Sequence, residues 1–316
     1  MNPSRRRRMN LVRIYTWTLS EDKQSADRGV LPKHLMNPSQ RLQSIGAGGG
    51  PGLCKSRKGQ GWQKMNYEDV QKVSNAAAAK SQLVNTGFGK YFTRAVMAGF
   101  FIVLAMIFSN VVGNVFSGAE LPAWGKFFSA VVFSIAVLLI SMVGGELFTG
   151  NNFVMAFGAI DQKVTWKETG KVWLVSYIGN FVGCLILTLI FVWAGAAGTK
   201  DYFAGFINNK LSIPLGEMFF RAVLCNFFVC LGVLCGIKLK SEAAKILMII
   251  MCISGFVISG FEHSIANMST FVAAYCLVPG LSVTAMLKSM LVVTVGNMVG
   301  GAVLLAWPLR KMSADQ

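Results

Sequence analysis

Residues 144–151 read GGELFTGN and residues 260–267 read GFEHSIAN, and each stretch interrupts a long hydrophobic run. Both follow the pattern Gly-x-Glu, four further residues, then Asn, which gives equivalent carboxylates and amides: Glu146 with Glu262, and Asn151 with Asn267. A charged side chain at membrane depth is costly, so it is found where it is paired, faces water or serves a function. Broken helices at equivalent places in two halves of a chain point to a transport site near the middle of the membrane.

The composition is that of a protein with many membrane spans. The chain has 316 residues, of which 53% are hydrophobic and 14% charged, whereas a soluble domain carries about 25% charged residues. Five uncharged runs approach or exceed the roughly 20 residues needed to cross a bilayer: 95–119, 127–145, 172–199, 264–287 and 289–309.

The first 64 residues differ from the rest of the chain. They hold 13 Lys and Arg against 3 Asp and Glu, and so carry most of the net charge of +16. They lack the apolar core of a signal peptide, and four successive arginines without interleaved aromatic residues do not make a nucleic-acid module. We therefore expect 1–64 to be a disordered or non-native extension, and we expect no nucleic-acid partner.

The remainder divides into three parts. Residues 65–90 are predicted to form an amphipathic helix on the membrane face, 91–311 a six-span transport domain, and 312–316 a tail. The six predicted spans are 92–117, 126–160 (broken near 144–150), 168–196, 214–238, 245–278 (broken near 260–266) and 285–309.

The two halves of this domain repeat one another. Arg94-Ala95-Val96 in span 1 matches Arg221-Ala222-Val223 in span 4, and the Gly-Asn-x-Val-Gly of span 3 (179–183) recurs in span 6 (296–300). Each repeat has three spans, an odd number, so the second lies upside down relative to the first. The expected fold class is an all-α membrane protein with six transmembrane helices in an inverted 3+3 repeat and two broken helices.

Lysines in the loops predict the orientation. The 161–171 loop, the 238–245 loop and the C-terminal tail carry most of them, together with the N-terminal side. By the positive-inside rule both termini are cytoplasmic, in the plasma (inner) membrane.

The sequence gives little support to enzyme or metal chemistry. Six of the seven cysteines lie in hydrophobic segments without metal-ligand spacing, and no GxSxG, HExxH, P-loop or GxGxxG motif is present. We expect no metal, no cofactor and no catalytic residue.

The breaks themselves suggest anion transport. The free N–H groups at the start of a half-helix attract anions, so Glu146 and Glu262 are better interpreted as structural braces, together with Asn151 and Asn267. His263 lies at the second break, and histidine is the side chain that changes charge near neutral pH. It is the candidate proton donor or gate.

Three stretches resemble the formate/nitrite transporter family: FEHSIANM at 261–268, GELFTGN at 145–151 and RAVLCN at 221–226. The resemblance covers about residues 66–311. It implies a homopentamer of aquaporin-like protomers in the lipid bilayer, each with its own pore for small monovalent anions of weak acids, such as formate, nitrite or hydrosulfide.

The resemblance also implies roles for particular residues. These are transport and proton relay at His263 and Thr149, anion attraction in a vestibule at Lys210 and Asn226, and an apolar constriction at Phe133, Val137, Phe256 and Leu147. The formate channels of the family carry leucine where Val137 stands, so the constriction is expected to be slightly wider here.

Two free-energy costs, that of desolvating the anion and that of protonating it, decide in what form it crosses such a constriction. Moving an ion into a dry medium costs tens of kcal/mol by the idealised Born estimate, whereas protonating a carboxylate with pKa near 4 costs roughly 4 kcal/mol at pH 7. The expected function is thus a proton-linked channel, in which the anion is protonated near His263; whether His263 donates the proton or only orients the substrate is left open. The rival interpretations are a neutral-solute channel of the water/glycerol class, an intramembrane enzyme and a scaffold.

Overall fold

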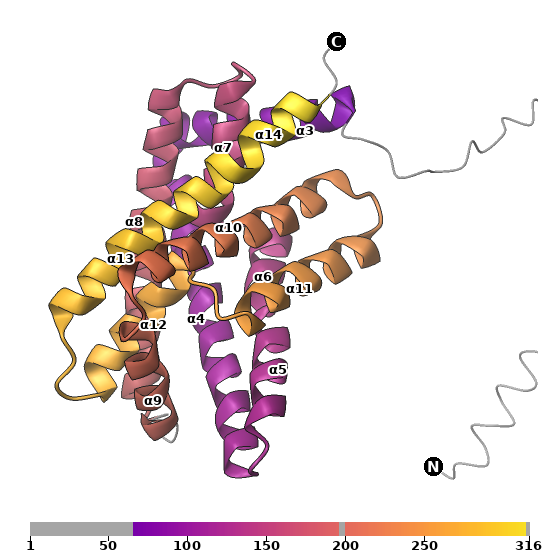
Figure 1. Ribbon diagram of the computed structural model, residues 1–316. Helices are drawn as coiled ribbons and strands as arrows, with labels where there is room; N and C mark the ends of the chain where they lie inside the picture. The colour runs from indigo at the N-terminus through magenta and orange to yellow at the C-terminus, as the bar shows by residue number, and fades with distance from the viewer. Residues whose placement is uncertain (1–65, 196–199, 314–316) are drawn as a thin grey trace, which may run out of the picture. The chain divides into compact units, whose positions relative to one another are not determined.

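Helices make up the regular structure of the residues that the computed structural model describes, 66–195 and 200–313 (Figure 1). In chain order they are α3 (Tyr67–Thr86), α4 (Phe88–Gly118), α5 (Pro122–Phe133), α6 (Ile135–Val143), α7 (Phe148–Ile160), α8 (Trp166–Trp193), α9 (Lys200–Leu211), α10 (Leu215–Lys238), α11 (Glu242–Ile258), α12 (Ser264–Leu277), α13 (Val283–Met298), the π-helical segment η3 (Val299–Ala306) and α14 (Trp307–Met312). The expected basic extension, 1–64, lies outside the described residues.

Five helical segments of the described chain are long and apolar enough to cross a membrane. They are Phe88–Gly118, Pro122–Val143, Trp166–Trp193, Leu215–Lys238 and Val283–Met312. Helix α11 is shorter, at 17 residues, and the apolar half-helix α12 follows it across a break. Together α11 and α12 occupy the place of the fifth predicted span, which confirms the six-span plan.

The packing of the helices follows the predicted inverted repeat. In the first half α4 packs against α5 and α8, and in the second half α10 packs against α11 and α13. The half-helices α7 and α12 cross between the halves, because α7 packs against η3 and α12 against α8. In Figure 1, α13, η3 and α14 form one continuous yellow helix that runs across α10.

Two glycines allow the helices of each half to cross closely. A Cβ on Gly183 of α8 would stand 2.1 Å from the carbonyl oxygen of Val96 on α4, and a Cβ on Gly300 would stand 2.2 Å from that of Val223 on α10. No other residue type fits at such a distance, which is the role that small residues play where membrane helices meet. Such close glycine contacts at equivalent places confirm that the two halves are structural repeats.

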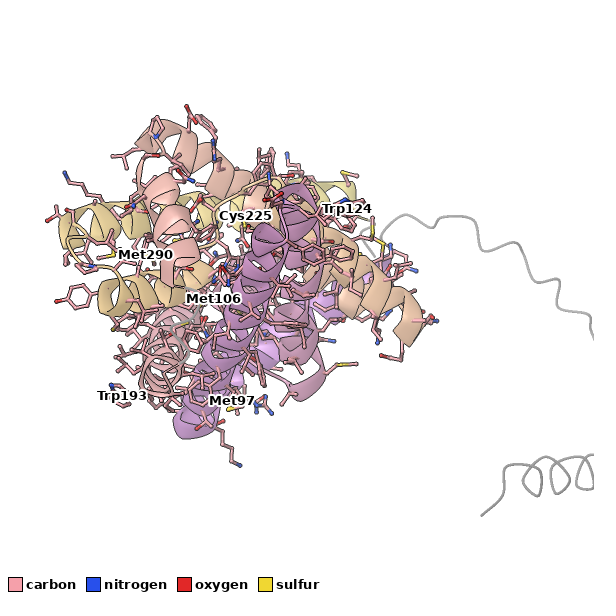
Figure 2. All side chains as sticks on the ribbon, turned by 90° about the horizontal axis from the view of Figure 1, so that it is seen from below. Met97, Met106, Trp124, Trp193, Cys225 and Met290 are labelled. Carbon is pink, nitrogen blue, oxygen red and sulfur yellow. The ribbon has the colours of Figure 1, made fainter. Side chains whose placement is uncertain are left out.

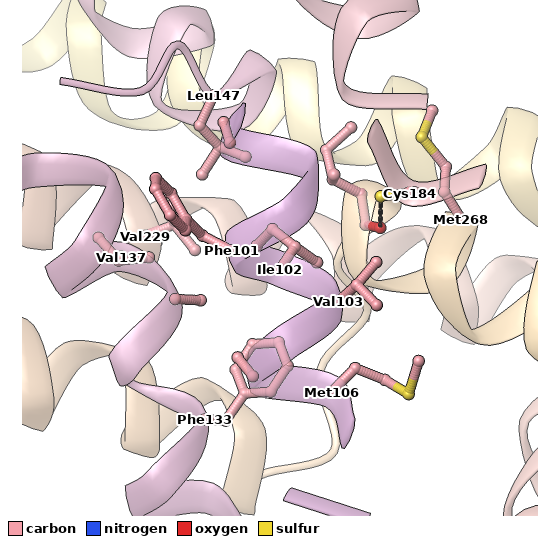
Figure 3. Close-up of a cluster of buried hydrophobic side chains, with 14 of the residues drawn as sticks. Phe101, Ile102, Val103, Met106, Phe133, Val137, Leu147, Cys184, Val229 and Met268 are labelled. Carbon is pink, nitrogen blue, oxygen red and sulfur yellow. Dashed lines mark hydrogen bonds between the residues drawn. The ribbon is translucent and has the colours of Figure 1, made fainter. Parts of the chain in front are cut away.

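The largest apolar cluster lies around α4 (Figure 3). Phe101, Ile102, Val103 and Met106 of this helix are buried, and they belong to one cluster with Val137. Figure 2 views the bundle from below: Met106 and Cys225 lie in its interior, whereas Trp124 and Trp193 lie at its periphery. The large exposed apolar side chains suit a protein whose flanks face lipid or other subunits.

Helix α3 is fastened to the bundle by polar contacts. Asn66 caps it by accepting a hydrogen bond from the N–H of Asp69 at 2.9 Å. Burial raises the pKa of Asp69, but hydrogen bonds and charge from Lys72 and Lys238 outweigh burial and leave that pKa below its usual value. Further along the helix, Ser74 donates to the Asp161 carboxylate at 2.6 Å.

The structure differs from the sequence-based expectation at three places. The stretch around Lys210, which lies between the third and fourth predicted spans, is the helix α9. The second span is interrupted at Ser134, between α5 and α6, where the Ser134 hydroxyl donates to the carbonyl of Ile250 on α11 at 3.3 Å. The last span contains the π-helical segment η3, and π-helical turns are frequent at functional sites.

Candidate functional site

Glycines in the left-handed region end the helix before each break. Helix α6 stops at Val143, where Gly144 has φ +87°, and α11 is followed by Gly260 with φ +70°. Residues with a Cβ rarely adopt this conformation, so each glycine is required by the turn. The chain then runs on without helical hydrogen bonds until α7 and α12 begin at Phe148 and Ser264.

An asparagine on α8 satisfies the backbone of the first break. The Asn180 Nδ2 donates to the carbonyls of Ala95 and Glu146, each at 2.8 Å, and its Oδ1 accepts from the N–H of Phe148 at 2.9 Å. Non-helical backbone at membrane depth is tolerated only where the protein or water supplies such partners.

An asparagine on α13 does the same for the second break. The Asn297 Nδ2 donates to the carbonyls of Ala222 and Glu262 at 2.8 and 2.9 Å, and its Oδ1 accepts from the N–H of Ser264 at 2.8 Å. The Gly-Asn-x-Val-Gly repeats of the sequence therefore do more than permit close packing, because their asparagines hold both breaks in place.

Glu262 lies in a Lys–Glu–Asn group that is nearly dry. Both its carboxylate oxygens accept from Lys210 Nζ, at 2.8 and 2.7 Å, and Oε2 also accepts from Asn267 Nδ2 at 2.8 Å. The side chains of Lys210 and Glu262 are 10% and 3% exposed. Because its charge is matched by a buried carboxylate, Lys210 presents little uncompensated charge.

Glu146 forms the corresponding group in the first half. Lys80, on α3, donates to its carboxylate, and Asn151 Nδ2 donates to the same oxygen at 3.2 Å and to the Tyr91 hydroxyl at 2.9 Å. Sequence reasoning missed Lys80. The inverted repeat could have indicated it: Glu146 and Glu262 are equivalent, so a lysine partner for one of them predicts a cationic partner for the other.

Thr149 and His263, one from each half, meet between these two groups. The Thr149 Oγ1 lies 2.9 Å from His263 Nε2, and both residues are buried. The other ring nitrogen, Nδ1, accepts a hydrogen bond from the N–H of Ala266 at 3.1 Å and so caps α12. The Phe256 ring stacks on the imidazole, with centroids 5.8 Å apart.

Apolar side chains lie on both sides of this contact. The rings of Phe133 and Phe256 meet edge to face at 6.3 Å on one side. Val137 and Leu147, 3% and 4% exposed, are buried on the other, and Figure 3 shows Phe133 below Val137 and Leu147. The four residues predicted to form the constriction are thus buried near the meeting point of the two breaks.

Two cavities approach the barrier. The first, here called the α3 vestibule, has a volume of about 610 Å³ and is lined by Lys80, Glu146, Asn151, Val137 and Leu147 among others. The second, the α9 vestibule, has a volume of about 760 Å³ and is lined by Lys210, Glu262, Asn267, Phe133, Phe256 and His263 among others. Each vestibule therefore ends at one Lys–Glu–Asn group and one apolar pair.

Asn226 lies elsewhere than its predicted vestibule role requires. It is fully buried and lines neither vestibule. Its Nδ2 donates to the backbone carbonyls of Thr149 and Asn297, at 3.2 and 2.6 Å. In the structure Asn226 connects α7 to α13 and fixes the backbone of Thr149.

The chain was compared with known proteins. Residues 67–310 match the family model described as formate/nitrite transporter. An uncharacterized transporter of Bacillus subtilis, YwcJ, is 32% identical over 80% of this chain and its own full length. The nitrite transporter NirC of Escherichia coli is 28% identical over 73% of this chain and 86% of its own. The formate channel FocA of Haemophilus influenzae is 29% identical over 67% and 82%.

Two solved structures of similar proteins point to the same family. One described as an FNT family ion channel is 26% identical, covers 76% of this chain and 97% of its own, and superposes with a TM-score of 0.71. Another, described as a pentameric formate channel with formate bound, is 26% identical, covers 69% and 94%, and gives a TM-score of 0.59. On the match of its whole helical region, this chain belongs to the formate/nitrite transporter family.

Proposed function

We propose that the protein carries small monovalent anions of weak acids, formate or nitrite in the first place and hydrosulfide as well, across the membrane together with a proton. The observation that carries this proposal is the contact between Thr149 and His263, which lies inside an apolar barrier between two polar vestibules. Relatives named as a nitrite transporter and a formate channel support the substrate class.

The barrier favours the neutral acid over the anion. Phe133, Phe256, Val137 and Leu147 are all less than a tenth exposed, so a bare anion among them would lose its hydration at a cost of tens of kcal/mol in the idealised limit. Protonation costs a carboxylate only about 1.4 kcal/mol for each unit between its pKa and the pH. The anion therefore takes up a proton in a vestibule and crosses as the acid.

The geometry favours His263 as an orienting group. Since Nδ1 accepts the N–H of Ala266, a neutral imidazole carries its proton on Nε2 and donates it to Thr149 Oγ1. The Thr149 hydroxyl is then free to donate to the substrate. An imidazolium would place a second proton on Nδ1, opposite the N–H of Ala266, and would lose this cap. The proton consequently comes from vestibule water, and His263 with Thr149 positions the acid.

The other predicted residues have supporting roles in this proposal. Lys210 with Glu262 and Lys80 with Glu146 keep each vestibule polar up to the barrier, with Asn267 and Asn151 as braces. Asn226 acts through Thr149, whose backbone carbonyl it holds.

We propose further that the protein is a homopentamer in the plasma membrane with both termini in the cytoplasm. The likeness to a pentameric formate channel supports the assembly. The lysines of the 161–171 and 238–245 loops support the orientation, which places the α3 vestibule on the cytoplasmic side. The family match gives no support to the neutral-solute channel.

The test is formate and nitrite flux into proteoliposomes at several pH values above the pKa of each acid. Flux at fixed total concentration should rise about tenfold for each unit that the pH falls, because the neutral fraction does so. His263→Phe should lower the rate and keep this slope. Loss of the slope in His263→Phe would show that His263 supplies the proton, and glycerol uptake without formate flux would contradict the anion proposal.

A further inference from the structure

Each vestibule is lined by three cations and two carboxylates. In the α3 vestibule the charged side chains are Lys80, Arg94, Glu146, Glu242 and Lys245. In the α9 vestibule they are Lys126, Lys210, Glu217, Arg221 and Glu262. The same surplus of one positive charge thus appears on both sides of the barrier.

Ion pairs account for four of the five charges in each vestibule. Beside the pairs Lys80–Glu146 and Lys210–Glu262, Lys245 lies 2.8 Å from Glu242 at one mouth, and Arg221 lies 3.3 Å from Glu217 at the other. Exposed pairs of this kind add little stability, but at a distance their opposite charges cancel. They leave little field to attract an anion.

Arg94 and Lys126 are the remaining charges. Both are exposed, and within residues 66–195 and 200–313 neither side chain forms a hydrogen bond or an ion pair. Arg94 lies on α4 directly beside the first break, since its own carbonyl accepts the N–H of Glu146 at 3.1 Å. Lys126 lies on α5 in the wall of the other vestibule.

We propose that Arg94 and Lys126 are the capture sites that concentrate small anions, one at each end of the pore. The inference rests on the proposed function and assigns capture to these residues instead of the paired lysines Lys80 and Lys210. A cavity with a net charge of one sign and low-dielectric walls raises the local concentration of the opposite ion. Exposed charges are screened by salt, however, so capture by these two residues depends on ionic strength.

The two residues are not related by the repeat. Arg94 is matched in the second half by Arg221, which Glu217 neutralises, and the surplus charge of that side comes from Lys126 on a different helix. Inverted symmetry alone therefore does not produce the equal surplus. Two unrelated positions supply one unpaired cation each.

The experiment measures formate KM from each side in membrane vesicles of opposite orientation at low salt. Arg94→Gln should raise KM about fivefold for formate arriving at the α3 vestibule and leave KM from the other side unchanged, a fold-change that matches two unit charges about 4 Å apart in water. Lys126→Gln should do the reverse. Arg94→Lys, which keeps the charge, should restore the KM of the unmodified protein.

Two further arms separate charge capture from a structural effect. The charge-neutral double variant Glu242→Gln with Lys245→Gln should leave KM unchanged. In about 1 M salt, where the Debye length is near 3 Å, the difference between Arg94→Gln and the unmodified protein should vanish. A KM that stays the same in both single variants, or an Arg94→Lys protein that behaves like Arg94→Gln, would overturn the proposal. The unmodified protein would still carry formate in either case, so this failure is distinct from failure of the proposed function.

Discussion

At the scale of single residues, the two halves are alike where they support the pore and different where they meet in it. Asn180 and Asn297 hold the two breaks through the same set of hydrogen bonds. By contrast, Thr149 stands where the second half has Ile265, and His263 stands where the first half has Leu147. The polar pair at the centre therefore arises from positions at which the repeats have diverged.

Replacing Thr149 tests this centre. Thr149→Val keeps the shape of the side chain but removes the hydroxyl, so the acid loses a hydrogen-bonding partner in dry surroundings. A lost partner there costs about 1–3 kcal/mol, which corresponds to a roughly 5- to 150-fold lower formate flux. Thr149→Ser keeps the hydroxyl and should retain most of the flux. Equal flux in the valine and serine variants would remove Thr149 from the mechanism.

Some of these residues could be predicted and others could not. A glutamate in an apolar run is conspicuous, so Glu146 and Glu262 identified the breaks directly. Lys80 was not predicted, because its partner Glu146 lies 66 residues further along the chain, in the break between α6 and α7. The bracing role of Asn226 was also not foreseen, since it depends on which backbone carbonyls the folded chain brings to it.

At the scale of helices, close crossings decide whether the breaks come together. Gly183 brings α8 against α4, and Gly300 brings the last span against α10. The breaks lie beside these crossings, because Asn180 and Asn297 are three residues before the two glycines. Displacement of either crossing would move the asparagine that satisfies the neighbouring break.

Gly183→Ala should therefore destabilise the protein strongly. A Cβ at 2.1 Å from the Val96 carbonyl oxygen cannot be accommodated unless α4 and α8 separate, and overpacking of this kind costs typically 1–3 kcal/mol or more. The matched control is Gly170→Ala in the same helix, where nothing lies within 4 Å of the added Cβ. Thermal unfolding in detergent should show a lower midpoint for Gly183→Ala only, and equal midpoints would contradict the role of the crossing.

Helices with long apolar sequences could be predicted, whereas short or mixed ones could not. The long spans and their breaks follow from uninterrupted apolar runs of bilayer length. Helix α9 has only 12 residues and a mixed composition, so it carried no such signal. The π-helical segment η3 was not predicted either, because its apolar sequence is like that of an ordinary membrane helix; in the structure its Gly300 and Gly301 pack against α10 and α7.

At the scale of the whole molecule, one chain supplies every group of the proposed path. Both Lys–Glu–Asn groups, both vestibules and the Thr149–His263 contact come from the same protomer. A pentamer of such chains would then contain five independent pores, and assembly would stabilise the protomers without completing their sites.

Mixed assemblies test this independence. When unmodified and Thr149→Val chains are co-expressed at varied ratios, formate flux should fall in proportion to the fraction of variant chains, because each pore works alone. Native mass spectrometry should give five chains in every mixture. Flux that falls more steeply than this fraction would show that the pores depend on one another.

The inverted repeat also has a consequence for the direction of solute transport. In the proposed mechanism, a solute from either side meets a Lys–Glu–Asn group, an apolar pair and the Thr149–His263 contact, and both directions of transport cross the same barrier. Such a pore would be passive, so the concentrations of acid and proton on the two sides would set the net direction of transport. With the proposed activity, the same molecule would release a weak acid from the cell when the acid accumulates there and would take it up when it is more abundant outside.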